Sequence, residues 1–293
     1  MYLLNQVHER ELRSLGDFFK FTADTLITRD HKYGFRGHAN ISWKLEPTLA
    51  RFMDRLVSAY PKLKQERERA TRIVLRRLHE GFKNNLIKNN DLPQERIERM
   101  DLWQYGQHFG LPSPLLDWTR SPYIALFFAL ADDVNGSEKR CVWVLNLELL
   151  QLLNESVVQE VRPKFKDRLK SEDLLDEQFP VLRVIQELNE NNRRLVFQQG
   201  FFTKHDYYRS LEVWLNRIVA ELHFNRSDRP LLQKCTFSCT EGERISFLDK
   251  LDAMNINPRT LFPDIAGSVL GAIDETFRSF QEPSSKGFHF SAS

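Results

Sequence analysis

The most apolar stretch of the chain follows a polar corner. Residues 122–131 are almost entirely apolar, and this pattern predicts a helix that is buried on nearly all sides. Ser121 is a favoured N-cap and Pro122 suits the first helical position, so the helix should begin there. The glycines and prolines of residues 103–114 predict an irregular loop, and Leu115-Leu116 predicts a short strand between this loop and the corner.

Asp117, Trp118 and Thr119 place polar groups at this corner. The free N–H groups at a helix N-terminus can bind an anion, so the corner is a candidate site for a phosphate or a cofactor. A well-packed helix with an ordinary cap explains the same residues and is the commoner case.

Apolar residues recur at helical spacing in several other segments. They predict helices at residues 8–28, 61–89, 94–104, 208–224 and 264–279, and a further helix within residues 238–254. Short apolar segments predict strands at residues 33–38, 141–147 and 231–239, and two strand segments around Gly200 within residues 193–205. Strands and helices mix without strict βαβ alternation, and this order favours an α+β fold over a doubly wound one.

We therefore expect one domain over residues 1–282. Its core should be a mixed, split β-sheet surrounded by helices, with helical insertions at about residues 52–102 and 148–192. Charges of alternating sign in residues 148–180 indicate that this insertion is exposed, and the Ser-rich residues 283–293 indicate a flexible tail.

Composition excludes few functions. The chain has 293 residues, of which 41% are hydrophobic and 28% charged, and its net charge of +2 implies no nucleic-acid or membrane role by itself. No apolar stretch approaches the ~20 residues that a membrane span needs, and the N-terminus does not resemble a signal peptide. Cys141, Cys235 and Cys239 cannot all pair and lack zinc spacing, so we expect a cytoplasmic protein with no membrane association and no metal site.

Residues 61–89 combine an apolar stripe with many lysines and arginines. These cations could form a docking surface for nucleic acid or for an acidic partner. A solvated helix face with internal i,i+4 ion pairs is the commoner explanation of such a run.

Arg36 lies inside an apolar strand between Gly34 and Gly37. Arginine is rarely buried without a partner, and its guanidinium matches carboxylates and phosphates with two parallel bonds. It could therefore bind an anionic ligand or form an internal pair with a carboxylate. Gln198 and Gln199 leave a similar choice, because one of them should face inward and either hold the backbone or bind a polar ligand.

Common catalytic and nucleotide-binding motifs are absent from the sequence. The chain contains no Gly-x-Gly-x-x-Gly, no Walker lysine loop, no Gly-x-Ser-x-Gly and no His-Glu-x-x-His. A functional site must therefore be sought in less common motifs.

Six sequence blocks occur in order along the chain. They are Phe35-Arg36-Gly37, Trp43-x-Leu45-x-Pro47-Thr48-Leu49-Ala50-Arg51, Gln107-His108-Phe109-Gly110-Leu111-Pro112, Leu115-Leu116-Asp117-Trp118-Thr119, Gln198-x-Gly200-x-Phe202-Thr203 and Thr260-Leu261-Phe262-Pro263-Asp264. Together they resemble the FRG domain, a bacterial and phage family that is named for its Phe-Arg-Gly motif. The resemblance covers roughly residues 15–275 and implies no settled activity.

A second resemblance is to the ADP-ribosyltransferases, which use three motifs in sequence. Arg36-Gly37 is similar to the first motif, residues 116–121 with Ala125 and Phe128 are similar to the second, and Gln198 is similar to the third. The second motif here reads Asp-Trp-Thr in place of a Ser-Thr-Ser pattern, and the third has Gln where Glu is usual. The resemblance implies an ADP-ribosyltransferase-like sheet core, NAD as the cofactor and a macromolecular acceptor.

Carried onto this chain, the resemblance implies roles for named residues. Arg36 would hold the pyrophosphate and Gln198 would orient the ribose, while His108 would serve as a base because glutamine cannot. The other residues expected to bind the cofactor are Gly37, Tyr105, Phe109, Asp117, Trp118, Thr119 and Ser121. We predict that Arg36, His108, Thr119 and Gln198 line one cleft.

Three functions are compatible with these motifs. The first is an ADP-ribosyltransferase that modifies a protein or nucleic acid, as a toxin or phage-defence effector, with an antitoxin or regulatory protein as a further partner. The second is a non-catalytic module that senses a nucleotide, which the Gln at position 198 favours. The third is a metal-dependent nucleic-acid hydrolase using Asp117 with another carboxylate, which the basic helix favours weakly.

Overall fold

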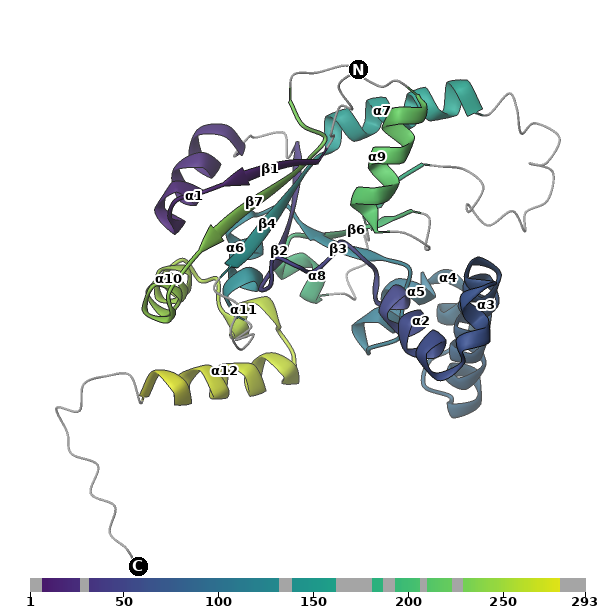
Figure 1. The fold of residues 1–293 in the computed structure, drawn as a ribbon. Coiled ribbons are helices and arrows are strands. Elements are labelled where there is room, and N and C mark those ends of the chain that lie inside the picture. Colours follow the sequence, from purple (N-terminus) through teal and green to yellow (C-terminus); the bar gives the residue numbers. More distant parts are fainter. Residues whose placement is uncertain are drawn as a thin grey trace, which may run out of the picture.

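The computed structural model shows three layers, with helices on both faces of a central β-sheet (Figure 1). It describes residues 7–26, 32–131, 139–161, 181–186, 193–205, 210–222 and 229–279. The expected tail at residues 283–293 and most of the expected insertion, residues 162–180 and 187–192, lie outside these ranges. No helix within the described ranges is long and apolar enough to cross a membrane.

The described residues form one seven-stranded sheet in the order β1-β7-β4-β2-β3-β6-β5. Its strands are β1 (Val7–Glu11), β2 (Tyr33–His38), β3 (Leu116–Thr119), β4 (Lys139–Asn146), β5 (Arg183–Ile185), β6 (Gly200–Lys204) and β7 (Leu232–Ser238). β1 runs parallel to β7, and every other neighbouring pair is antiparallel. A mixed sheet surrounded by helices confirms the general architecture that the sequence predicts.

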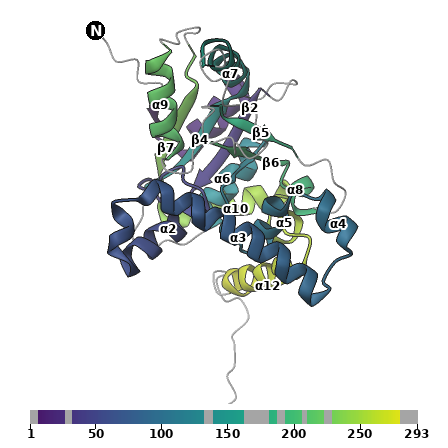
Figure 2. The same cartoon turned by 90° about the vertical axis from the view of Figure 1, so that its right-hand side faces the viewer.

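The structure describes twelve α-helices, of which nine fall into three groups around the sheet. Their bounds are α1 (Leu15–Phe21), α2 (Thr48–Ala59), α3 (Arg67–Asn89), α4 (Gln94–Arg99), α5 (Leu102–His108), α6 (Pro122–Ala131), α7 (Leu147–Val161), α8 (Arg193–Phe197), α9 (Leu211–Glu221), α10 (Glu241–Ala253), α11 (Pro258–Leu261) and α12 (Ile265–Ser279). A π-helix at Thr22–Leu26 and a 3₁₀ helix at Pro61–Lys64 complete them. α1, α6 and α10 cover one face of the sheet, and α7 and α9 cover the other (Figure 1). Figure 2 shows α2 to α5 lying together at one side of the molecule.

β4 shows why both faces of the sheet are buried. Val142 and Val144 belong to the core that β4 shares with α1 and α6. Cys141, Trp143 and Leu145 belong to the core under α7 and α9. Successive side chains of a strand point to opposite faces, so this nearly continuous apolar run supplies both cores at once.

The expectation of an irregular loop at residues 103–114 is wrong in its first half, where α5 forms a helix. Asp101 caps α5 by accepting hydrogen bonds from the N–H groups of Trp103 and Gln104 at 2.8 and 3.2 Å. The helix ends just before Gly110, whose φ of 87° suits glycine. Local capping therefore outweighs the glycines and prolines that indicated a loop.

Three further expectations are wrong for local reasons. Residues 8–11 belong to strand β1 and not to a helix. β1 is an exposed edge strand without alternating apolar residues, so no sequence pattern indicated it. Residues 193–197 form helix α8 and not a strand, and the chain turns into β6 through Gln199, whose φ is 47°. The start of the insertion expected to be exposed is the packed helix α7, whose Leu150 and Leu153 are buried in the core.

Helix α6 begins at Pro122, as the sequence predicts. The Ser121 hydroxyl accepts a hydrogen bond from the N–H of Ile124 at 3.3 Å and caps the helix. The N–H of Ser121 in turn donates to the Thr119 hydroxyl at 3.1 Å. The cap therefore joins the end of β3 to the start of the buried helix.

Ser121→Ala is expected to lower the free energy of unfolding by about 1 kcal/mol, because it removes the cap acceptor of α6. Urea denaturation of both proteins measures the difference. Ser58→Ala serves as the control, since Ser58 is exposed near the end of α2. Equal stability of Ser121→Ala and the wild type would show that the cap contributes nothing.

Strands β2 and β3 diverge in the middle of the sheet. Six residue pairs join β2 to β4, but Phe35 and Thr119 alone pair β2 with β3. On its other side, β3 pairs with β6 along all four of its residues. The sheet therefore opens beside this single pair, next to Arg36 and Asp117.

Candidate functional site

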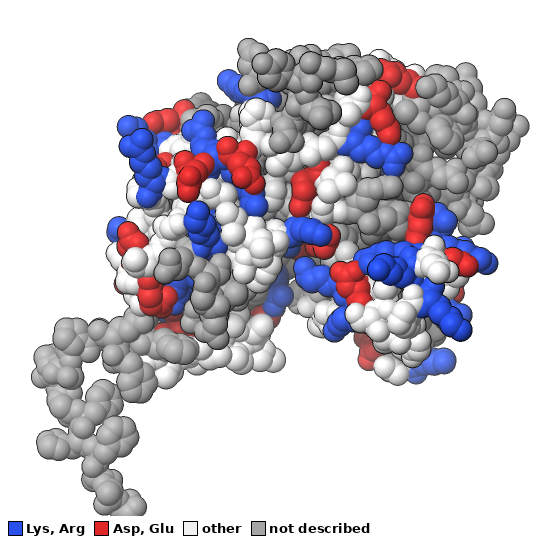
Figure 3. All heavy atoms as spheres, in the orientation of Figure 1, with Lys and Arg blue, Asp and Glu red and all other residues white. Residues whose placement is uncertain are grey.

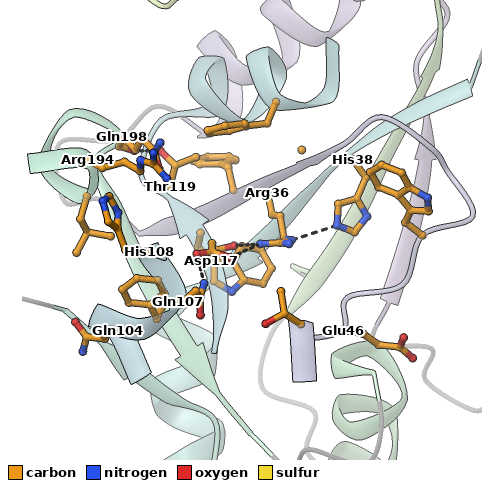
Figure 4. Close-up of a pocket in the computed structure, with 18 of the residues that line it drawn as sticks. Arg36, His38, Glu46, Gln104, Gln107, His108, Asp117, Thr119, Arg194 and Gln198 are labelled. Carbon is orange, nitrogen blue, oxygen red and sulfur yellow. Dashed lines mark hydrogen bonds and ion pairs between the residues drawn. The ribbon is translucent and has the colours of Figure 1, made fainter. Parts of the chain in front are cut away.

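A cleft of about 950 Å³ lies where β2 and β3 diverge. Residues of β2, β3, α2, α5, α6 and α8 line it, together with the segment that precedes α2. Figure 4 shows side chains converging from these separate elements. Arg36, His108, Thr119 and Gln198, the four residues predicted to share a cleft, all line it.

Arg36 is held at two points and keeps one edge open. Its Nε donates to Nε2 of His38 at 3.2 Å, and its Nη1 donates to the backbone oxygen of Asp117 at 2.6 Å. The Asp117 carboxylate lies 3.4 Å from the same Nη1. Burial lowers the pKa of Arg36, and Asp117 opposes this effect. Nη2 has no hydrogen-bond partner among the described residues, so it can bind a ligand.

Asp117 belongs to a chain of hydrogen bonds. Gln107 donates from its side-chain amide to the Asp117 carboxylate, and the Ser113 hydroxyl donates to Oε1 of Gln107. The N–H of Ser113 donates to the Thr48 hydroxyl at 2.8 Å. This chain of bonds runs from α2 through α5 to β3 and Arg36. It therefore connects four of the six sequence blocks, although the sequence assigned no role to Gln107.

His38 orients Arg36, and the sequence interpretation missed it. The residue is 4% exposed, and Nε1 of Trp143 lies 3.3 Å from its Nδ1. Burial, followed by the nearby charge of Arg36, lowers the pKa of His38 to about 3. The imidazole is therefore neutral near pH 7, so Nε2 can accept the bond from Arg36. Residues 36 and 38 share one face of a strand, which was the signal available in the sequence.

Acidification is expected to destabilise the protein through His38. The pKa of His38 is about 3 in the folded protein and 6.5 without burial. Between these two pH values the unfolded state binds a proton at His38 that the folded state does not. The contribution of neutral His38 to the free energy of unfolding is fully present above pH 6.5, and it falls by about 1.4 kcal/mol per pH unit as the pH drops toward 3. Urea denaturation between about pH 7 and 5 measures this slope. His38→Gln should flatten it, and an unchanged slope in that variant would contradict the assignment.

Thr119 and Gln198 lie next to each other (Figure 4). The Thr119 hydroxyl donates to the backbone oxygen of Gln198 at 2.6 Å. Nε2 of Gln198 donates to the backbone oxygen of Leu261 at 3.1 Å. Gln198 therefore holds the backbone, which was one of the two roles left open by the sequence, and it also lines the cleft. Gln199 is exposed.

His108 shares a carboxylate with Arg194. The Asp264 carboxylate lies 3.7 Å from Nε2 of His108 and 3.1 Å from Nη2 of Arg194. Burial and the charge of Arg194 lower the pKa of His108, so its imidazole is neutral near pH 7. Arg194 lies 4.8 Å from the ring centre of Phe262, and its Nε is buried without a hydrogen-bond partner in the described chain. The sequence interpretation missed Arg194 and Asp264, although Asp264 ends the last of the six blocks.

Tyr105, Phe109 and Ser121 were expected to bind the cofactor, but they do not line the cleft. Gln104 and His108 line it because residues four apart share one face of a helix. Tyr105 and Phe109 lie one position further along α5, where they pack on each other with ring centres 5.1 Å apart. Ser121 caps α6. The helical form of α5 therefore places Tyr105 and Phe109 outside the cleft lining, and the capping of α6 accounts for the position of Ser121.

Gly37 and Trp118 line the cleft and also have structural roles. A Cβ atom at Gly37 would collide with the backbone of Ala125 and Ala129, so only glycine lets β2 approach α6 this closely. Trp118 is 3% exposed, and its Nε1 donates to the Thr203 hydroxyl at 2.9 Å. These contacts account for both residues without a ligand.

The cleft has an excess of positive charge. Arg36 pairs with Asp117, and Lys44 lies 3.9 Å from Glu46. Arg51 is exposed and forms no ion pair with the residues that the structure describes, and its charge acts on Arg36. The charged side chains that line the cleft are Arg36, Lys44, Arg51, Arg194, Glu46 and Asp117. Such a lining favours an anionic ligand.

The fold and the site define a mixed α/β protein with a cationic cleft beside a Phe-Arg-Gly strand. The family model of the FRG domain matches residues 31–138, so this part of the chain is similar to FRG domains. The match contains Arg36, His108 and Asp117 and is shorter than the resemblance expected from the sequence, since the blocks at Gln198 and Asp264 lie outside it. No curated protein matches the chain, and no solved structure does.

Proposed function

We propose that the cleft binds NAD and that the protein is an ADP-ribosyltransferase that modifies a macromolecular acceptor. The main support is that Arg36, His108, Thr119 and Gln198, from four sequence blocks, line one cleft with excess positive charge. A few polar groups that converge in a cavity are typical of ligand sites. The activity suits a cytoplasmic toxin or phage-defence effector, and an antitoxin or regulatory protein would then restrain it.

The residues of the cleft fit NAD. The volume of about 950 Å³ lies within the ~300–1,000 Å³ of small-molecule sites. Nη2 of Arg36 and the guanidinium of Arg51 would hold the pyrophosphate through charge-assisted hydrogen bonds. Trp43, Phe128 and Phe262 line the cleft and would present rings to the nicotinamide or adenine.

NAD would supply an ADP-ribose group attached to nicotinamide as the leaving group. In the transfer, the bond from the ribose to nicotinamide breaks, a bond from the ribose to an acceptor oxygen or nitrogen forms, and the acceptor loses a proton. Gln198 cannot take this proton. His108 would take it, because its imidazole is neutral and Asp264 faces Nε2, which leaves Nδ1 as the accepting atom.

A non-catalytic nucleotide sensor is the second candidate. Gln stands at position 198 where the transferases have Glu, and its Nε2 is already bonded to the backbone of Leu261. The two carboxylates that line the cleft, Asp117 and Glu46, lie beside Arg36 and Lys44. A sensor would bind NAD and transfer nothing. The third candidate, a metal-dependent hydrolase, would need a group of metal ligands, and none gathers within the described residues.

Two measurements test the proposal. Calorimetric titration of the wild-type protein with NAD measures binding. Incubation with NAD that is labelled in its adenylate part, in the presence of protein, RNA and DNA acceptors, measures transfer. Binding with transfer supports the transferase, whereas binding without transfer supports the sensor. The absence of binding would contradict both.

Gln198→Ala is expected to reduce transfer more than NAD binding, because its contact with the ribose should strengthen at the transition state. The transfer rate at saturating NAD and the Kd are measured separately. Gln199→Asn is the control, since Gln199 is exposed and does not line the cleft. Equal losses of binding and transfer in Gln198→Ala would restrict this residue to its structural bond with Leu261.

A further inference from the structure

The segment that contains α2 and α3 concentrates the positive charge of the chain. Residues 48–89 contain 11 lysines and arginines but only four aspartates and glutamates, whereas the whole chain contains 42 and 40. The segment therefore carries a net charge of +7, and the remainder of the chain carries −5. Figure 3 shows Lys and Arg side chains gathered where Figure 1 places α2 and α3. The nearly neutral total conceals this uneven distribution.

Ion pairs neutralise only part of this segment. Three arginines of α3 form them, through the pairs Arg67–Asp54, Arg69–Glu66 and Arg72–Glu68. Four other cations of α3, namely Arg76, Arg77, Lys83 and Lys88, form no ion pair with the residues that the structure describes. The solvated helix with internal pairs, which is the commoner explanation from sequence, therefore accounts for less than half of the α3 cations.

Several of these cations share one face of α3. Arg69, Arg72, Arg76 and Lys83 are separated by steps of three, four and seven residues, which return to the same face of a helix. Glu68, which pairs with Arg72, and Glu80 are acidic residues on the same face. A helix of 23 residues extends over about 35 Å, so its cations can follow a long polyanion.

Positive charge continues from α3 to the cleft. Arg67 of α3 contacts Asp54 of α2, and Arg51 of α2 lines the cleft. Exposed aromatic side chains accompany this path, since Tyr60 is 63% exposed at the end of α2 and Trp43 is 42% exposed in the cleft lining. Single-stranded nucleic acids bind to surfaces that combine a cationic track with aromatic rings on which bases stack. An acidic protein would use the cations and not the rings.

We infer that the α2–α3 surface docks a single-stranded nucleic acid and guides it toward the cleft. The identification of that nucleic acid as the acceptor of ADP-ribose rests on the proposed function, whereas the docking itself does not. The probe is a fluorescent single-stranded oligonucleotide of about 16 nucleotides, long enough for one such site. Fluorescence anisotropy of the full chain, between about 50 and 200 mM salt, gives the affinity and its salt dependence.

The test compares two variants of equal net charge. One carries Arg72→Ala, Arg76→Ala and Lys83→Ala, which remove three cations of the shared face of α3. The control carries Arg13→Ala, Lys20→Ala and Lys250→Ala, in and beside α1 and α10, which lie on the opposite side of the molecule in Figure 1. The α3 variant should bind at least about tenfold more weakly, and the slope of log K against log salt should fall by about 2, since each lost phosphate contact removes ~0.7. The control should bind like the wild type.

Other outcomes would overturn the inference. Equal weakening of both variants would show attraction by net charge alone, and stronger binding of poly-glutamate than of the oligonucleotide would show that the partner is an acidic protein. No binding by the wild type would exclude docking outright. NAD titration of the same α3 variant separates the two proposals, because its Kd for NAD should equal that of the wild type whether or not transfer occurs.

Discussion

Arg36→Ala is expected to weaken NAD binding by about ten- to hundredfold and to reduce transfer at least as much. The variant loses charge-assisted hydrogen bonds worth about 1.5–3 kcal/mol. It also leaves Asp117 facing the ligand without the arginine that lies 3.4 Å from its carboxylate. Calorimetric titration and transfer of labelled ADP-ribose measure the two effects.

Arg36→Lys separates charge from geometry. Lysine keeps the positive charge, but its single ammonium group cannot contact His38 and Asp117 and also present a third donor edge to a ligand. Binding should therefore remain weakened. Arg55→Lys is the matched control, because Arg55 is exposed on α2 and does not line the cleft. NAD binding that survives Arg36→Ala unchanged, in a protein shown to be folded, would remove Arg36 from the site.

Gly37→Ala is expected to lower the free energy of unfolding by about 3 kcal/mol, the upper end of the usual overpacking range. The added Cβ would meet the backbone of Ala125 and Ala129, and the backbone of a buried helix cannot turn away as a flexible side chain can. Urea denaturation or, if the variant is too unstable, its yield of folded protein measures the loss.

Gly81→Ala is the matched control for this substitution. Gly81 lies inside α3, and nothing lies within 4 Å of a Cβ atom built there. Replacement of a glycine in a helix interior by alanine should stabilise the protein by up to about 1 kcal/mol. If Gly37→Ala proved as stable as the wild type, β2 and α6 would have to separate easily, and the position of Arg36 would then be less fixed than the structure indicates.

The sequence predicted elements whose signal is local. β2, β4 and α6 follow directly from short apolar runs and from the cap at Ser121, and the structure contains each of them. α8 was taken for a strand because its five residues are too few to show a helical period. The turn that follows α8 contains Gln199, whose positive φ no sequence pattern revealed. Short elements without a cap signal depend on tertiary contacts.

The candidate site was predictable to a similar extent. Arg36 and Thr119 stand out because each is a polar residue beside apolar neighbours. His38 and Gln107 lie inside or beside the same blocks and act through other side chains, so composition alone gave them no role. Arg194 is one of many surface-type arginines in the sequence, and only the tertiary contact with Asp264 places it at the cleft.

The single residue pair between β2 and β3 has a mechanical consequence. The sheet consists of two groups of strands, β1-β7-β4-β2 and β3-β6-β5, and the pair Phe35–Thr119 acts as a hinge between them. Arg36 belongs to the first group and Asp117 to the second, so their ion pair links the two groups. A ligand that contacted both groups of strands would add a second link between them, so ligand binding in the cleft would make the whole sheet more rigid.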